Sequence, residues 1–513
     1  MIPCETSVCM VSYSIRTGVP ILGQLLPRSS RLISLFCVLL QVINIQFLRM
    51  DQESINLNPA QYFKDSLIGG LGADRSKMIR VNAAAIADAH IGVIESGSIV
   101  LKPTDSGYQI IACGPSKQID TLNLPESMIE LTLSNRLVMP AMVNAHTHLD
   151  LTHIGPVAHN SEDGFVQWVN MIRENRKSED TDIRNAVHLG ITKSLAGGCI
   201  AVGDIAGAPA GRLTDAPAYE LGKSPLIGVS YLEFFGIGKT ANSAIDKVQS
   251  YLDNQYAQVK TKLVGTGVRI GLQPHATNTI DLPVYQWVTQ IASELNLPVS
   301  THLAETIEER MFIFDGIGPQ RAMLQRLGVW DDSTLDYIAH GNHPVEHLRD
   351  VLAHAPMLVA HVNDATDSAI ECLAETNTSV AYCPRASEYF GATKHFGPHR
   401  YQDMLAAGIN VCLGTDSIVN LDTPDRISIL DEMRLLARRD GTDAKTLIQM
   451  ATINGCTALG LDPNPFTLAP NMKPAGLISI PLDSGNQDVW ANAMRSDQPP
   501  EWVFQRKNPH GMS

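Results

Sequence analysis

Short apolar runs recur along most of this chain and alternate with longer stretches in which apolar residues repeat every three or four positions. This alternation predicts βαβ units and a parallel sheet. One helix is predicted over 183–195, capped by Thr181 or Asp182 and stopped by Gly197 and Gly198. Eight strand candidates, enough to close a (β/α)8 TIM barrel of the α/β class, lie at 137–146, 199–205, 226–235, 268–275, 298–303, 357–361, 379–383 and 410–415.

The two ends of the chain have a different pattern, with short strands separated by turn residues. Near the N-terminal end, 91–100 and 108–114 suit a meander, and 474–506 has the same character. Neither group is long enough to form a core alone, so we expect them to meet in one small composite β-sandwich. The predicted organisation is an N-terminal extension over 1–77, sandwich parts over 78–135 and 461–513, and a barrel over 136–460.

The N-terminal extension fits poorly with the rest. Its apolar run at 32–48 is flanked by arginines but is interrupted by polar residues, and it is shorter than the roughly 20 residues that a membrane span needs. Three hypotheses remain open: an uncleaved anchor, an amphipathic packing segment, and translated sequence upstream of the true start. We favour the last, with disorder as a corollary, because Met50 and Met78 are available starts.

Polar groups that can bind a metal stand at the ends of the predicted strands. His146 and His148 are two residues apart, so on a strand their side chains project to the same side. His302, His361 and Asp416 each end a further apolar segment. Because the C-terminal ends of barrel strands form one face, where the chemistry of that fold occurs, we expect these side chains to converge on a metal site.

Four motifs occur in one order along the chain and together are highly specific: 140–148, with its two histidines, 302–305, 383–387 and 413–417. From about Met78 onward the chain resembles the amidohydrolase superfamily, within its mononuclear branch. That branch holds adenosine, S-adenosylhomocysteine, aminodeoxyfutalosine, guanine and cytosine deaminases and triazine chlorohydrolases. The family usually has an aspartate where Gly476 stands, a departure that concerns packing of the sandwich.

The donor set predicts the metal. Three neutral imidazoles, from His146, His148 and His302, with the carboxylate of Asp416, make a site suited to zinc, with iron or manganese as alternatives. The alternative for Asp416 is a purely structural role, as a buried aspartate with satisfied hydrogen bonds after a Gly-Thr turn. The resembled binuclear enzymes use a lysine at the end of strand four, and 268–275 contains none, so one divalent metal is expected.

Three residues are predicted to carry the reaction. Glu305 lies at the start of a helical run, where it can move a proton to a ring nitrogen or a departing amine. Its alternative is an acid placed favourably at a helix N-terminus. His361 is expected to orient and deprotonate a water molecule, or to polarise the substrate, and Asp416 to take part in that deprotonation. Four histidines upstream of His361 are expected to be mostly solvated: His340, His343, His347 and His354.

Three further residues are predicted to contact the substrate. His275 ends strand four and resembles the family's substrate-contacting histidine, although a satisfied core histidine is a serious rival. Trp168 could stack on a heterocycle and Arg385 could hold a carboxylate, but each is as typical of packing or of a loop anchor. The segments around Trp168 and Arg385 look most like those of aminodeoxyfutalosine and related purine nucleoside deaminases.

Composition narrows the partners. The 513 residues are 44% apolar and 18% charged, which suits an ordinary soluble enzyme. The net charge of −14 repels phosphate backbones, so nucleic acid is not expected as a partner, and a membrane is not favoured either. Nine cysteines, without a Cys-x-x-Cys pair, are typical of a reduced cytoplasmic protein. We expect a small heterocyclic substrate and leave a homodimer open.

The sequence therefore predicts a zinc-dependent hydrolase of non-peptide carbon–nitrogen bonds that deaminates an aminopurine nucleoside or a related heterocycle. Two alternatives remain. The same machinery could expel chloride or an alkylamine from a triazine, or the barrel could be catalytically silent and bind a metabolite or partner.

Overall fold

The structure is a computed structural model, and it describes residues 66–70, 76–105, 107–483 and 488–506. The hypotheses about 32–48 fall outside these residues. Within the predicted extension, the described part includes helix α3 (Leu67–Gly70), whose Ile68 packs into a buried cluster of the N-terminal sheet. The domain boundaries stay a prediction.

Two four-stranded parallel sheets form the centre of the fold, in the orders β5-β6-β7-β8 and β9-β10-β11-β12. Isolated bridges join the sheets at both edges, between Leu272 and Val299 and between Ala276 and His302 on one side and between Thr147 and Asp416 on the other, which closes the predicted barrel. The strands are β5 (Met142–Thr147), β6 (Cys199–Ala206), β7 (Ile227–Phe234), β8 (Val268–Pro274), β9 (Ser300–Leu303), β10 (Leu358–His361), β11 (Ser379–Tyr382) and β12 (Val411–Leu413).

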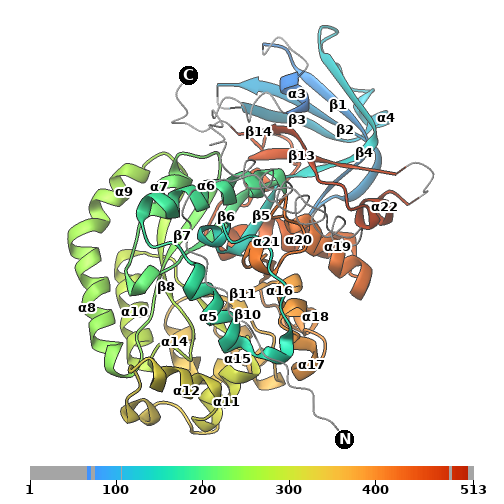
Figure 1. Ribbon diagram of the computed structural model, residues 1–513. Helices are drawn as coiled ribbons and strands as arrows, with labels where there is room; N and C mark the ends of the chain where they lie inside the picture. Colours follow the sequence, from blue (N-terminus) through green and yellow to red (C-terminus); the bar gives the residue numbers. More distant parts are fainter. Residues whose placement is uncertain (1–65, 71–75, 106, 484–487, 507–513) are drawn as a thin grey trace, which may run out of the picture. The chain divides into compact units, whose positions relative to one another are not determined.

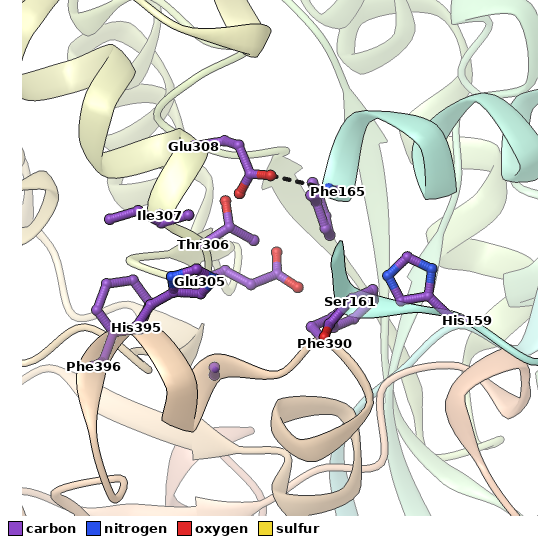
Figure 2. Close-up of a pocket in the computed structure, with 11 residues that line it drawn as sticks. His159, Ser161, Phe165, Glu305, Thr306, Ile307, Glu308, Phe390, His395 and Phe396 are labelled. Carbon is purple, nitrogen blue, oxygen red and sulfur yellow. Dashed lines mark hydrogen bonds between the residues drawn. The ribbon is translucent and has the colours of Figure 1, made fainter. Parts of the chain in front are cut away.

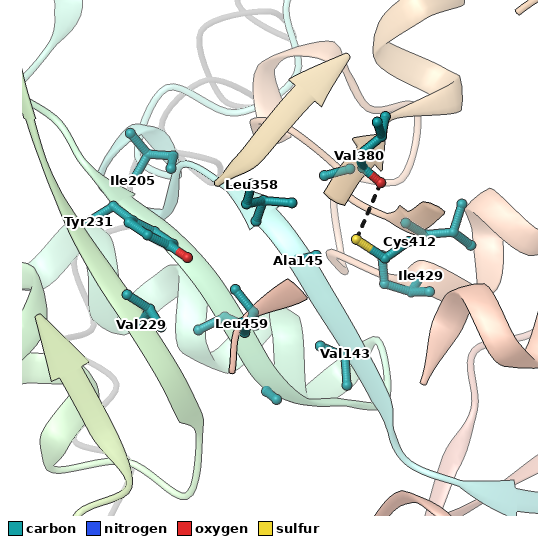
Figure 3. Packing of buried hydrophobic residues seen from close by; sticks show 14 of the residues in the cluster. Val143, Ala145, Ile205, Val229, Tyr231, Leu358, Val380, Cys412, Ile429 and Leu459 are labelled. Atoms are coloured by element: carbon teal, nitrogen blue, oxygen red, sulfur yellow. Dashed lines mark hydrogen bonds between the residues drawn. The ribbon is translucent and has the colours of Figure 1, made fainter. Parts of the chain in front are cut away.

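Apolar side chains fill the inside of the barrel, as its strand sequences require. Figure 3 shows Val143, Tyr231 and Leu358 from three different strands packed in one buried cluster. Each of them is at most 2% exposed. The cluster is therefore a packed core rather than a channel.

Helices connect and cover the barrel strands (Figure 1). They are α5 (Phe165–Asn175), α6 (Asp180–Ala196), α7 (Ala216–Gly222), α8 (Ala241–Tyr251), α9 (Ala257–Leu263), α10 (Leu282–Leu295), α11 (Ile307–Asp315), α12 (Pro319–Arg326), α13 (Pro344–His347), α14 (Arg349–His354), α15 (Asp367–Glu375), α16 (Pro384–Tyr389), α17 (Ala392–Phe396), α18 (Tyr401–Ala406), α19 (Ile429–Asp440), α20 (Ala444–Ala451) and α21 (Ile453–Ala458). Helix α6 ends before Gly197, as predicted, but it begins at Asp180, so Thr181 and Asp182 lie inside it and do not cap it.

Both ends of the chain meet, as the sequence predicted, and they do so in one six-stranded sheet of order β14-β13-β4-β1-β2-β3, where a sandwich was expected. Figure 1 shows the blue N-terminal strands beside the red C-terminal ones. The strands are β1 (Ile79–Asp88), β2 (Gly92–Thr104), β3 (Gly107–Pro115), β4 (Ile129–Pro140), β13 (Gly476–Pro481) and β14 (Glu501–Gln505), accompanied by α4 (Ser116–Ile119) and α22 (Val489–Arg495).

One predicted barrel strand belongs to two sheets. The apolar run 137–146 was expected to form a single strand, but its first part completes β4 and pairs with β1 and β13. The barrel strand β5 begins only at Met142. Because this run is buried against both the sheet and the barrel, its hydrophobicity does not mark the change, and the boundary prediction was wrong there.

Trp502 occupies the space beside Gly476, the position at which this chain departs from the resembled family. A Cβ added at Gly476 would lie 2.7 Å from Trp502 Cζ3 and 3.2 Å from the Phe504 carbonyl oxygen. The Trp502 indole donates a hydrogen bond to the Leu195 carbonyl oxygen at 2.8 Å, which ties the sheet to helix α6. The glycine therefore makes room for an indole that joins the sheet to the barrel.

Gly476→Ala is expected to lower the free energy of unfolding by about 1–3 kcal/mol, the usual cost of overpacking. Denaturant unfolding measures the loss. The same change in a Trp502→Leu background should cost much less, because the blocking ring is gone. An equal loss in both backgrounds would contradict this steric explanation.

Candidate metal centre and active site

Four predicted donors from distant parts of the chain meet at the C-terminal ends of the barrel strands. His146 lies on β5, His148 follows it, His302 lies on β9, and Asp416 follows β12. The Nε2 atoms of His302 and His148 are 3.3 Å apart, and His148 Nε2 lies 3.4 Å from Asp416 Oδ1. His146 Nε2 is 3.9 Å from the same oxygen.

These separations fit a divalent ion. Two donors that each lie about 2.1 Å from a tetrahedral ion are about 3.4 Å apart. Both ring nitrogens of the fully buried His146 lack a hydrogen-bond partner, as does Nδ1 of His148. Buried polar atoms are rarely left unpaired, and a cation among the facing donors would pair with His146 Nε2.

The protonation states suit metal binding as well. Burial lowers the pKa of both His146 and His148 well below the ordinary value, and neighbouring imidazoles add to the effect. The rings are therefore neutral near pH 7, as ligation requires. His302 Nδ1 donates to the His275 carbonyl oxygen at 2.8 Å, which leaves the Nε2 lone pair facing the other donors.

Two carboxylates share this buried region. Burial raises the pKa of Asp416 to about 7, with a smaller contribution from Glu233. The pKa of Glu305 lies well above its ordinary value, chiefly through burial and then through repulsion by Asp416. A divalent cation between these groups would offset the repulsion and favour the ionised form of its ligand.

Glu305 and His361 face each other beside the four donors. His361 Nε2 lies 3.5 Å from Glu305 Oε1. His146, His302 and His361 also have ring nitrogens within 4.8 Å of one another. His361 thus lies beside both the histidine donors and the Glu305 carboxylate, and the role predicted for it stays a prediction.

The backbone of Glu305 is held from both sides. The buried Glu309 carboxylate accepts the N–H groups of Ala304 and Glu305, at 3.0 and 2.7 Å. On the other side, the Asn363 amide donates to the Glu305 carbonyl oxygen at 3.0 Å, and the Ser387 hydroxyl donates to Asn363 at 2.6 Å. Ala304, with φ of 51°, makes the sharp turn that this arrangement fixes.

His275 lies near the donors, and Trp168 lies in an aromatic group nearby. The His275 ring centroid is 4.9 Å from that of His302, its Nδ1 bonds the Thr279 hydroxyl at 2.7 Å, and its side chain is 24% exposed. Trp168 stacks on Phe165 at 5.4 Å and meets Phe390 edge-on at 5.1 Å. Both placements are compatible with substrate contact, which stays a prediction.

Arg385 is engaged by the protein itself. Its Nε donates to Glu432 at 2.6 Å, and its Nη1 donates to Asp422 and Thr423 at 3.1 and 3.0 Å. Its Nη2 bonds the Ser428 carbonyl oxygen. This geometry favours the anchoring alternative named for Arg385, and its contact with a substrate carboxylate stays an untested prediction.

Sequence reasoning missed a buried ion-pair group behind the donors. Arg176 Nε donates to Asp150 at 2.8 Å and its Nη1 lies 3.4 Å from Glu233. Asp204 accepts the Leu149 N–H, and burial raises its pKa to about 8. Asp150, two residues after His148, was a visible signal, but nothing in the sequence links Arg176, at the end of α5, to it.

The four histidines upstream of His361 divide evenly. His340 and His354 are exposed, as expected. His343 and His347 are buried, and His343 lies 3.2 Å from Asp364. The expectation of solvent was wrong for these two, because helix α13 packs inward.

The model of the Amidohydrolase family matches residues 137–492, which contain all eight barrel strands and the returning strand β13. The chain belongs to the amidohydrolase family. Among curated relatives, the 5-methylthioadenosine/S-adenosylhomocysteine deaminase of Haloarcula marismortui is 30% identical over 410 residues. That alignment covers 76% of this chain and 85% of the relative.

Solved amidohydrolase structures have the same fold. Aminofutalosine deaminase of Helicobacter pylori, in complex with methylthio-coformycin, matches with a TM-score of 0.64 at 20% identity, covering 84% of this chain and 99% of that one. A variant of atrazine chlorohydrolase from Arthrobacter aurescens, complexed with zinc and atraton, matches with a TM-score of 0.60 at 17% identity, covering 85% and 97%. In the described part of this amidohydrolase, no helix has the length and apolarity to cross a membrane.

Glu309→Gln is expected to destabilise this amidohydrolase by about 1–3 kcal/mol. The amide can accept only on one side, so the N–H of Ala304 or Glu305 would face a donor in a buried place. Denaturant unfolding measures the effect, with the exposed Glu294→Gln as a matched control expected to stay within about 0.5 kcal/mol. Equal stability of the two variants would contradict the role given to Glu309.

Proposed function

We propose that this amidohydrolase hydrolytically deaminates an adenosine-like nucleoside with one bound zinc ion. The observation that carries the proposal is the meeting of His146, His148, His302 and Asp416 beside the facing pair Glu305 and His361. The deaminase relative and the aminofutalosine deaminase structure support the substrate class. Because the resembled enzymes remove an amino group from a ring carbon, the bond broken is a non-peptide carbon–nitrogen bond.

Zinc is proposed from the chemistry of the donors. Three neutral imidazoles and one carboxylate leave a position for solvent and suit zinc better than a hard cation. The zinc in the atrazine chlorohydrolase complex supports this choice. A bound zinc ion would lower the pKa of a water molecule toward neutrality and so supply a nucleophile at physiological pH.

The residues of the chain would manage the protons. Asp416 and His361 accept and hold a proton as the water oxygen bonds to the amino-bearing ring carbon. Glu305, buried and with a raised pKa, is suited to carry one proton to the ring nitrogen and a second to the departing amine. One water is consumed, the carbon–nitrogen bond breaks, and a carbonyl product and ammonia form.

A second candidate is hydrolysis of a triazine, with loss of chloride or an alkylamine. The likeness to atrazine chlorohydrolase favours it, although that likeness concerns the fold alone. Ammonia release from adenosine-type nucleosides against chloride release from chlorotriazines separates the two. Ligand binding without turnover by the metal-loaded protein would instead favour the catalytically silent barrel.

Glu305→Gln is expected to lower kcat for nucleoside deamination about 10²- to 10⁴-fold, the usual contribution of a general acid/base. Metal content, measured by atomic emission, should not change, because Glu305 is not among the proposed ligands. Glu371→Gln, an exposed acid on α15, is the matched control and should keep full activity. Full activity in Glu305→Gln would remove this residue from the mechanism.

Adding zinc to chelator-treated protein is expected to raise the melting temperature and restore activity, since the ion binds only the folded chain. At a hundredfold excess over Kd the stabilisation should reach about 2.7 kcal/mol. His302→Ala should lose this response, whereas the exposed His340→Ala should retain it. A normal zinc response in His302→Ala would refute the proposed ligand set.

A further inference from the structure

A pocket opens directly onto Glu305. It holds about 350 Å³ of empty space, part of it open to solvent, and it is lined by segments 159–165, 305–308 and 390–396. Figure 2 shows the Glu305 carboxylate directed into the space between Phe165 and Phe390 on one side and His395 and Phe396 on the other. If Glu305 serves the reacting ring, as proposed above, this pocket offers the adjoining space for the rest of the substrate.

The wall of the pocket is mainly apolar and aromatic. Phe165 and Phe390 meet edge-on with ring centroids 5.3 Å apart, and Trp168 supports both from behind. Phe396, Ile307 and Ala392 complete the apolar lining. Such faces favour an alkyl or aryl group over a hydrated charge.

The charges at the wall are acidic. Glu308 lines the pocket with Glu305, and its Oε1 accepts the Phe165 N–H at 3.1 Å, which fixes the carboxylate at the wall (Figure 2). Burial lowers the pKa of His159, so this imidazole is neutral near pH 7. His395 is the other histidine of the lining.

A compensating cation is lacking among the described residues that line this pocket, which include no lysine or arginine. Lys394 is the nearest in sequence. Its Nζ bonds the Ser161 hydroxyl and Glu162 Oε1, both at 2.8 Å. An anionic group placed here would therefore meet the Glu308 carboxylate, and no lysine or arginine of the lining would pair with it.

We propose that this site selects adenosine-like nucleosides whose ribose-side tail is uncharged and apolar, and that it discriminates against tails that carry a carboxylate. The inference rests on the proposed function, because it places the ring at Glu305. It names Glu308 as a specificity-determining residue: the fixed carboxylate repels an anionic tail, and the phenylalanine rings bind an apolar one.

The test uses two substrates that differ by one carboxylate: 5′-benzylthio-5′-deoxyadenosine and its 4-carboxybenzyl analogue. The assay uses zinc-loaded protein at pH 8, where histidines of ordinary pKa are neutral. There kcat/KM for the uncharged compound should be about tenfold higher than kcat/KM for the carboxylate analogue. Glu308→Gln keeps an oxygen for the Phe165 N–H and should narrow that ratio at least threefold. The exposed Glu371→Gln should leave it unchanged.

Salt provides a measurement that does not depend on a variant. Raising the salt concentration from 50 to 500 mM should narrow the preference, because charge repulsion at a partly open pocket is screened. Equal kcat/KM values for the two compounds, or a preference that neither salt nor Glu308→Gln alters, would overturn the inference while deamination itself stands.

Failure of the proposed function has a separate outcome, namely no ammonia from either compound or from adenosine. In that case the selectivity between the uncharged compound and its carboxylate analogue is tested by measuring the dissociation constants of both by calorimetry. A dissociation constant at least tenfold lower for the uncharged compound supports it, and equal dissociation constants overturn it.

Discussion

The whole site depends on the cost of burying polar atoms without partners. His146 presents two buried nitrogens, and His148 and His361 one each, that no described protein group satisfies. Each such atom costs about 1–3 kcal/mol in a folded protein. A fold with marginal stability keeps this cluster only if something else pairs with it, and a bound cation is the partner that donors of this kind accept.

Backbone strain at the strand ends is a second free-energy cost of the site. The strained left-handed conformation changes the direction of the chain where the site residues stand. Ala304, His361 and Asp416 all have positive φ, at 51°, 75° and 57°. For residues other than glycine each such conformation costs about 1–3 kcal/mol, and it persists only where the surroundings enforce it. Where the barrel closes, backbone hydrogen bonds enforce the conformation of Asp416 directly, because the N–H groups of Thr415 and Asp416 both donate to the His146 carbonyl oxygen.

The sequence predicted best the features that depend on local periodicity. The two-residue alternation of a strand predicted that His146 and His148 project to the same side. Apolar runs that end in a polar group predicted strand-end positions for His302, His361 and Asp416. Periodicity gave no warning that 137–146 crosses from one sheet to another, because both environments are apolar. It was also silent on contacts made by long side chains. Arg385 reaches Glu432 and Arg176 reaches Glu233 across the fold, and such partners depend on packing angles that a linear pattern does not contain.

The balance of charge connects the metal with the substrate. Asp150, Glu233, Glu305 and Asp416 gather at the strand ends, and Arg176 is the guanidinium paired with the first two. The proposed zinc ion would balance the negative charge of Asp416. The two positive charges at the inner end of the site, the zinc ion and the Arg176 guanidinium, would then both be paired with protein carboxylates. At the outer wall Glu308 stands without a cation among the lining residues. Because the described residues that line the pocket include no lysine or arginine, the proposed apolar tail would gain its affinity from the aromatic wall, beside the ring that Glu305 reaches.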